Sequence, residues 1–339
     1  MIVTFALEAA AAAVKADADA RDLNQHLSFL KLWHEHGVLV QTPQKSGLMP
    51  IIDCMPQRFK TKWQTALRNN RYTDKCGNSF ISGAGGIALI DAFKGNVEVI
   101  FITEATAILE YDFEEIEPTR KINVSGVHPD KIEVCRFDCA NSSESFSNIE
   151  RLGESMIPEG MQIVELWKAR FQRLAELSKH IVIVDRYCCE PGANIEGLKK
   201  LLVLIDGSAN KAQVSLFTGF GSRRGTLQSP NRSGCDLFER VSEIVAELCR
   251  GGIKGCMLHC VGDDSFERYS HGRFLRFDDD EVCEIDVGVA IFSGSHTFRQ
   301  SNFSMKHNCD DYLKTEKLLR AEADKYSGPI DLLDRHPSN

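Results

Sequence analysis

The feature that most constrains the fold is an amphipathic stretch that leads directly into a buried apolar run. Between residues 161 and 179, apolar side chains recur at helical spacing, and residues 180–185 then read His-Ile-Val-Ile-Val-Asp. A short continuous run of β-branched residues is typical of a strand that is buried on both faces. The segment therefore predicts a helix that feeds a central strand of a sheet.

The same alternation continues as far as residue 292. The sequence predicts a helix around Leu198 and another over residues 237–248, the second ending at a Gly-Gly pair that allows a left-handed cap. Five strands are expected to form one sheet, at residues 181–184, 214–217, 256–261, 273–277 and 287–292. This β-α-β-α-β-β-β order predicts a mixed sheet with helices packed on its faces, including those near Trp167 and Leu198.

A group of residues suited to phosphate chemistry follows the third of these strands. Residues 271–278 read His-Gly-Arg-Phe-Leu-Arg-Phe-Asp, and a Ser-Gly-Ser-His turn begins at Ser293. Because side chains alternate along a strand, His271 and Arg273 are expected on one face. A histidine can attack phosphorus or act as a base, while a guanidinium neutralises the non-bridging oxygens of a phosphodiester.

This His-x-Arg-x4-Asp pattern resembles the His-x-Lys-x4-Asp and Gly-Ser motif of the phospholipase D superfamily, over roughly residues 165–300. The resemblance implies a phosphodiesterase, here expected to be a nuclease, in which His271 forms a phosphohistidine. Arg273 would hold the reacting phosphate oxygens, Asp278 would be the carboxylate of the motif, and Ser295 would orient a non-bridging oxygen.

Arg273 departs from the family pattern, which has lysine at this position. Arginine holds phosphate but does not give up its proton. His-x-Arg also occurs in non-catalytic phospholipase-D-like domains, such as the one at the end of MIT-domain membrane-trafficking proteins, so the alternative is a module that binds phosphate, nucleic acid or a protein. In a purely structural interpretation, His271 is a strand-edge histidine and Asp278 opens an acidic run typical of a solvated turn.

The sequence contains only one copy of the motif, because neither His180 nor His259 is followed by a cation and an acid at the required spacing. Phospholipase-D-like sites usually combine two motifs. The catalytic interpretation therefore implies a homodimer in which two sites meet at a twofold axis. The binding interpretation instead expects a phosphate-containing ligand or a complex with another protein.

A net charge of −8 argues against a surface coated for nonspecific DNA binding, so any contact with nucleic acid must be local. The best candidate is the glycine-rich basic stretch over residues 219–232, in which Arg223, Arg224 and Arg232 are expected to bind substrate. A solvated loop with incidental arginines is the alternative.

Residues 1–112 are predicted to form a small, doubly wound α/β domain. Glu8 and Glu104 follow two of its expected strands, and carboxylates gathered at strand ends hold Mg²⁺ in metal-dependent nucleases of the PIN or Toprim type. By this fold analogy Asp17, Asp19 and Asp112 are further candidates. Alternatively, Glu8 is a first-turn acid of the next helix, and no cofactor is needed.

The remaining segments complete the predicted organisation. Residues 113–160 are rich in turn formers and are expected to be a linker with a short hairpin near residues 124–136. Residues 161–308 are expected to form the domain that the resemblance identifies as phospholipase-D-like, and residues 309–339 are expected to form a polar helix and a tail.

Twelve cysteines without an export signal predict free thiols in a reducing cytoplasm, and no apolar run approaches the length of a membrane span. The pairing of the two domains resembles that of bacterial proteins encoded in anti-phage defence and mobile-element systems, which implies an antiviral role.

Overall fold

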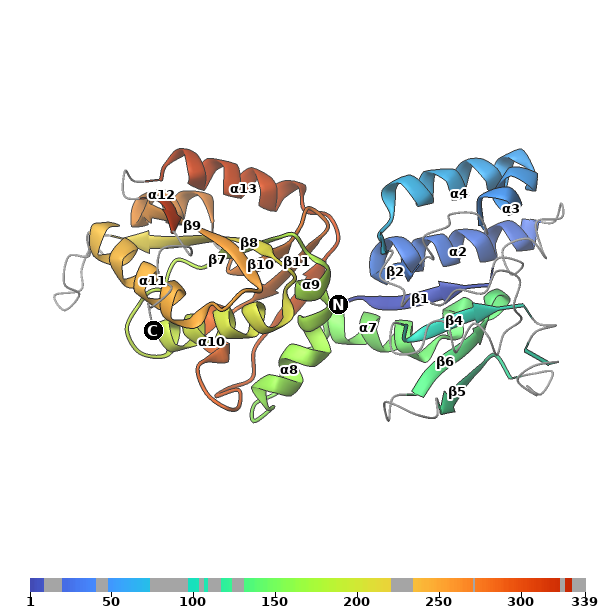
Figure 1. The fold of residues 1–339 in the computed structure, drawn as a ribbon, viewed down its shortest axis with the longest axis horizontal. Helices are drawn as coiled ribbons and strands as arrows, with labels where there is room; N and C mark the ends of the chain where they lie inside the picture. Colours follow the sequence, from blue (N-terminus) through green and yellow to red (C-terminus); the bar gives the residue numbers. More distant parts are fainter. Residues whose placement is uncertain are drawn as a thin grey trace, which may run out of the picture. The chain divides into compact units, whose positions relative to one another are not determined.

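The computed structural model describes residues 1–8, 20–40, 48–73, 97–103, 107–108, 117–123, 131–220, 234–270, 272–323 and 327–330. The chain divides into two compact units, one of residues 2–151 and one of Met1 with residues 152–339 (Figure 1). Both units are α/β, which confirms the predicted fold class. Within the described ranges, no helix combines the length and the apolar character needed to cross a membrane.

The first unit is built on a six-stranded sheet in the order β3-β2-β1-β4-β6-β5. Its parallel strands are β1 (Val3–Leu7), β2 (Gly37–Val40), β3 (Tyr72–Thr73), β4 (Val99–Ile102) and β6 (Lys131–Arg136), and β5 (Thr119–Asn123) runs antiparallel to β6. Strands β2 and β3 lie on one side of β1, and the chain then crosses to the other side of β1 to form β4 and β6. This change of side is the defining feature of a doubly wound sheet, as predicted.

Helices pack on this sheet through a cluster of aromatic side chains. They are α2 (Ala20–His36), α3 (Leu48–Cys54), α4 (Gln57–Asn69) and α7 (Glu144–Glu154), with the 3-10 helix η1 (Phe137–Ser142) (Figure 1). Phe5 of β1 makes edge contacts with Phe29 of α2, Phe101 of β4 and Phe146 of α7, at centroid distances of 5.6, 5.7 and 6.1 Å. Burial of such large rings contributes strongly to the stability of the unit.

The prediction that residues 113–160 form a linker is wrong for the described part of that segment. It contributes β5, β6, η1 and α7 to the first unit. The linker prediction rests on turn-forming residues, but serine, which is common in turns, is favoured equally at helix N-termini. Ser143 immediately precedes α7, and its hydroxyl accepts a hydrogen bond from the Phe146 amide (3.4 Å).

Glu133 of β6 organises the start of α7. Its carboxylate, 1% exposed, accepts hydrogen bonds from the amides of Glu144 (2.8 Å) and Ser145 (2.9 Å). The hydroxyls of Ser143 (3.1 Å) and Thr119 (2.7 Å) also donate to it. One buried carboxylate thus satisfies donors at the helix N-terminus and ties the helix to two strands.

Replacing Glu133 with alanine is expected to lower the free energy of opening of α7 by about 3 kcal/mol, because buried donors lose a charged acceptor. Hydrogen exchange of the α7 amides in the full chain measures this. Lys121→Ala is the control: it removes an exposed ion pair with Glu144 (2.6 Å) and should change the same quantity by less than about 1 kcal/mol. Equal protection in wild type and Glu133→Ala would contradict the assignment.

The second unit contains a seven-stranded sheet in the order β12-β11-β10-β7-β8-β9-β13. Strands β7 (His180–Val184), β8 (Ala212–Phe220) and β9 (Ile253–Gly262) are parallel, and β10 (Phe274–Phe277), β11 (Glu281–Ile285), β12 (Phe303–Lys306) and β13 (Gly328–Ile330) pair antiparallel with their neighbours. Four of the five predicted strands therefore lie in one sheet.

The fifth predicted strand, at residues 287–292, is wrong. Residues 288–292 form the buried 3-10 helix η2 (Gly288–Phe292), and the strand beside β10 is β11, which begins inside the acidic run. A short apolar run does not distinguish a buried strand from a buried helix, which explains the error. Residues 278–280 form a turn, as the structural interpretation of the acidic run expected, whereas Glu281 begins β11, is only 1% exposed and lies 3.0 Å from His307 Nδ1.

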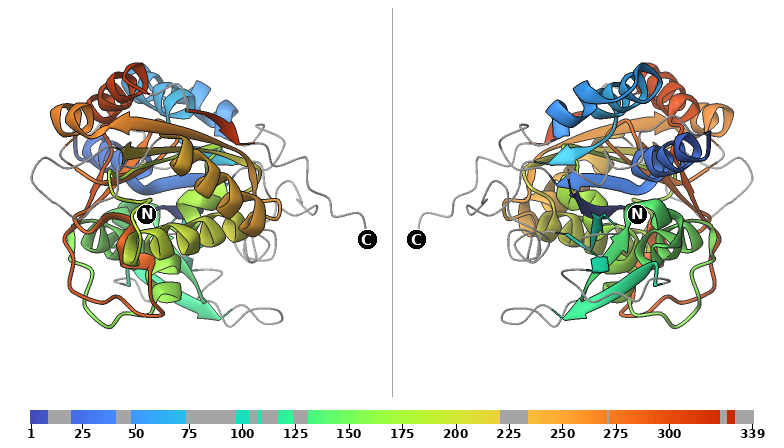
Figure 2. Two further views of the ribbon diagram at one scale, coloured as in Figure 1. Left: turned by 90° about the vertical axis from the view of Figure 1, so that its left-hand side faces the viewer. Right: turned by 90° about the vertical axis from the view of Figure 1, so that its right-hand side faces the viewer.

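Helices cover both faces of this sheet, as predicted (Figures 1 and 2). One face carries α8 (Ile163–Arg170), α9 (Gln172–Leu177), α10 (Ala193–Ser208) and α11 (Gly234–Leu248), and the other carries α12 (Asp263–Tyr269) and α13 (Asp310–Ala321). The predicted helix over residues 161–179 is interrupted at Phe171, and α12 was not predicted. The region after residue 308 is part of the unit, because α13 packs on the sheet and β13 extends it.

Candidate functional site

The carboxyl ends of β7, β8 and β9 lie at one edge of the second sheet because these strands are parallel. We call this the carboxyl edge. Strand β10 runs antiparallel to β7 and therefore begins there, so that Arg273 lies beside Asp185. Asp263 follows β9 at the same edge. Sites in open α/β sheets are typically found at such edges.

Asp185 is the buried centre of this edge, with 1% of its surface exposed. Its carboxylate accepts hydrogen bonds from the amides of Tyr187 and Val289, both at 2.9 Å. Burial raises the pKa of Asp185, and these hydrogen bonds together with Arg273 offset the rise only in part. The carboxylate thereby connects the end of β7 to the start of η2.

Arg273 is held from one side and open on the other. Its Nε lies 3.8 Å from Asp185 Oδ1, and its guanidinium lies 4.8 Å from the centroid of the Tyr187 ring. The side chain of Arg273 remains 29% exposed. The buried carboxylate and the ring restrain the guanidinium, and the exposed side can accept an anion.

A second arginine approaches the same tyrosine ring. The guanidinium of Arg186 lies 5.5 Å from the Tyr187 centroid, but its Nε donates to Asp263 (2.9 Å) and its Nη1 lies 3.6 Å from Glu267. Two carboxylates therefore balance Arg186, whereas among the described residues one more distant carboxylate balances Arg273. Of the two arginines, Arg273 has the greater capacity to bind an added anion.

Gly288 permits this arrangement. Its φ of +61° is in the left-handed region, and a Cβ at this position would overlap the Asp185 carboxylate and lie 2.6 Å from Arg273 Cδ. Only glycine therefore lets η2 approach closely enough for the Val289 amide to reach Asp185.

The structure places the other predicted residues of the motif elsewhere. Asp278 follows the far end of β10, where its carboxylate accepts hydrogen bonds from the amides of His180 (2.8 Å) and Lys179 (3.0 Å). It therefore anchors the amino end of β7 and is not brought to Arg273. Ser295 is exposed, with its hydroxyl 3.0 Å from His296 Nδ1 and its carbonyl bonded to the Ile163 amide at the start of α8.

Several predicted residues lie outside the described ranges. These are the proposed nucleophile His271, the substrate-binding candidates Arg223, Arg224 and Arg232, and the carboxylates Asp17, Asp19, Glu104 and Asp112. Their roles stay predictions.

The residues that support Arg273 were not predicted. Asp185 and Tyr187 come directly after the apolar strand β7. The rule that α/β sites form at carboxyl ends of strands, applied to β7 as it was applied to the first unit, would have identified them.

In the first unit, Glu8 follows β1 as predicted, and its carboxylate accepts a hydrogen bond from the amide of Thr103, just after β4 (2.8 Å). Among the described residues, no three His, Cys, Asp or Glu side chains gather in a way that could hold a metal ion. Ten cysteines in these ranges are free thiols.

Comparisons with known proteins add no family. No protein-family model matches the chain, and a search of curated proteins gives no match.

Gly288→Ala is expected to lower the unfolding free energy of the chain by about 2 kcal/mol or more, because it combines an unfavourable φ with overlap at Asp185. Urea unfolding followed by circular dichroism measures the loss. The matched control is Gly207→Ala at the end of α10, where an added Cβ meets no atom within 4 Å. That variant should be neutral or slightly stabilising, and equal stability of the two variants would disprove the close approach at Gly288.

Proposed function

We propose that the carboxyl edge of the second sheet binds a phosphodiester group, with Arg273 as the contact to its non-bridging oxygens. The observation that carries this proposal is the restrained but partly exposed guanidinium of Arg273, held between Asp185 and the Tyr187 ring. Planar guanidinium donors match two phosphate oxygens at once. Nucleic acid is the phosphodiester that we expect.

Arg273 is suited to a singly charged ligand. The carboxylates of Asp185, Asp263 and Glu267 lie at the same edge, and Arg186 is already engaged by the last two. A phosphodiester carries one negative charge and is repelled less by these acids than a phosphomonoester dianion would be. The binding function needs no contribution from Asp278 or Ser295.

Hydrolysis of the bound phosphodiester is the second candidate. It is favoured by the position of Arg273, because the chain enters β10 at the carboxyl edge and so brings the cation of the His-x-Arg motif to Asp185. In this mechanism His271 attacks phosphorus, a phosphorus–nitrogen bond forms, and the leaving alkoxide takes a proton from the motif histidine of a second copy of the chain. Water then releases the phosphate from His271.

Arg273→Gln should weaken binding of a fluorescein-labelled single-stranded oligonucleotide by about tenfold or more, because a charge-assisted contact is lost. Fluorescence anisotropy of the full chain at one fixed salt concentration measures the affinity. Arg173→Gln is the matched control: it removes the same charge from an arginine that also has a carboxylate partner, Glu176 at 3.0 Å. Equal affinities for the two variants would refute the assigned site.

Hydrolysis is tested separately with bis(p-nitrophenyl) phosphate, whose cleavage releases a coloured phenolate. If the chain is a phosphodiesterase of this type, His271→Ala should abolish turnover while EDTA has no effect, because the covalent nucleophile needs no metal. Loss of turnover on chelation, with His271→Ala fully active, would instead assign activity to Glu8 and Glu104 of the first unit. If light scattering shows that the chain is strictly monomeric, the shared histidine site is excluded, but the binding proposal is not affected.

A further inference from the structure

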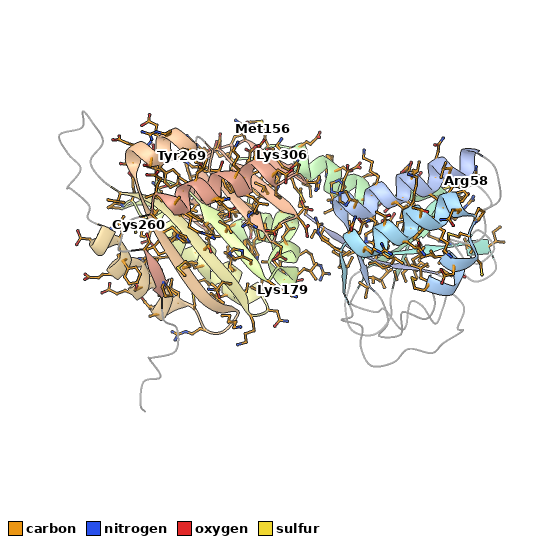
Figure 3. All side chains as sticks on the ribbon, turned by 90° about the horizontal axis from the view of Figure 1, so that it is seen from above. Arg58, Met156, Lys179, Cys260, Tyr269 and Lys306 are labelled. Carbon is orange, nitrogen blue, oxygen red and sulfur yellow. The ribbon has the colours of Figure 1, made fainter. Side chains whose placement is uncertain are left out.

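A second group of polar side chains lies on the α13 face of the same sheet, away from Arg273. We call it the His259 cluster, and it consists of His180 of β7, Ser215 of β8, His259 of β9 and Arg320 of α13. Figure 3 views this face, where the labelled Lys179 and Cys260 adjoin His180 and His259 in the sequence. None of the four residues belongs to the His-x-Arg motif or to the carboxyl edge.

His259 has a buried nitrogen without a partner. The side chain is 7% exposed, and its ring stacks on that of Phe217 with centroids 4.3 Å apart and planes 18° apart. Among the described residues, no group forms a hydrogen bond with His259 Nε2. Because buried polar atoms are almost always paired, this nitrogen is suited to an external partner.

The surroundings of His259 are positive. The guanidinium of Arg320 lies 5.9 Å from the Phe217 centroid, and no ion pair to Arg320 is formed within the described ranges. Burial first, and then Arg320 and His180, lower the pKa of His259 to about 4. The imidazole is therefore neutral near neutral pH and has one N–H to donate.

The other charged groups nearby are already engaged. Arg276 of β10 forms a buried ion pair with Glu316 of α13, at 2.5 and 2.7 Å, and also contacts Asp279. Asp278 accepts hydrogen bonds from the amides of Lys179 and His180. Arg320 thus contributes the unbalanced charge of the cluster, which disfavours a cation and favours an anion.

Ser215 and His180 add neutral hydrogen-bonding groups at the side of the cluster. The Ser215 hydroxyl lies 2.9 Å from His180 Nε2, and His180 is only partly buried. Burial and the nearby Arg276 lower the pKa of His180, so this imidazole is also neutral near neutral pH. Both groups can turn towards a ligand without a change in their charge.

We propose that the His259 cluster binds a small oxyanion, with Arg320 supplying charge and His259 Nε2–H donating a hydrogen bond. Two kinds of group have this chemistry, a phosphate and a carboxylate. Arg320 is exposed at the end of α13, so its side chain can move with the entering anion. The site is separate from the phosphodiester site, and neither depends on the other.

The test is a titration of the full chain with inorganic phosphate near neutral pH, followed by the imidazole Cε1–H resonances in NMR. Acetate at equal ionic strength provides the carboxylate arm, and chloride is the baseline. Binding should produce a saturable shift of the His259 resonance in at least one arm, and it should raise the pKa of His259 because an anion favours the protonated ring. The His259→Gln variant assigns the resonance.

Two variants locate the effect. Arg320→Gln, a surface change that leaves the core intact, should weaken the saturable shift by about tenfold or more, because it removes a charge-assisted contact. Arg273→Gln should leave it unchanged. Absence of a saturable shift with both anions, an unchanged shift in Arg320→Gln, or its loss in Arg273→Gln would each overturn the proposal.

Discussion

The carboxyl edge of the second sheet depends on the burial of one carboxylate, that of Asp185. Its two oxygens accept amide hydrogen bonds from Tyr187 and Val289, so a single side chain fixes the turn after β7 and the start of η2. Arg273 is placed by the same carboxylate. Burying a charge is unfavourable unless hydrogen bonds and an opposite charge compensate for it, and this geometry supplies both.

Buried acids organise other parts of the chain in a similar way. Glu133 connects two strands of the first unit to the N-terminus of α7, and Glu316 joins α13 to β10 through Arg276. Glu133 accepts hydrogen bonds from Thr119 and from residues 143–145, and Glu316 accepts two from the Arg276 guanidinium. In the Asp185 pair, however, the Arg273 Nε lies 3.8 Å from the carboxylate, and the arginine side chain is 29% exposed. This difference is the reason for proposing that Arg273, unlike the arginine of a closed structural ion pair, binds a ligand.

Local pattern was sufficient to predict most elements of the described structure. The β-branched run of β7 and the apolar stripe of α11 each appear within a few residues of their predicted positions, and Glu8 follows a strand, β1, as expected. The errors arose where one local pattern serves two structures. A five-residue apolar run became η2, and serines that suit a turn became the start of α7.

The candidate site was harder to predict than the fold. Arg273 was identified from its motif, but its partners Asp185 and Tyr187 are about ninety residues earlier in the chain and meet it only because β10 pairs with β7. The motif spacing also predicted the wrong place for Asp278. Strand β10 lies between Arg273 and Asp278, and at a rise of roughly 3.3 Å per residue the two side chains are at opposite ends of it. Strand order, which local sequence does not encode, decides which side chains come together.

The most direct test of the central claim is a crystal of the full chain soaked in perrhenate, an electron-dense tetrahedral oxyanion that carries one negative charge, as a phosphodiester does. If the carboxyl edge is a phosphodiester site, the anomalous difference map should show rhenium with its oxygens within hydrogen-bonding reach of the Arg273 guanidinium, and Asp185 and Tyr187 should still be in place behind it. Rhenium bound only elsewhere on the chain, with Arg273 accessible and empty, would contradict the account.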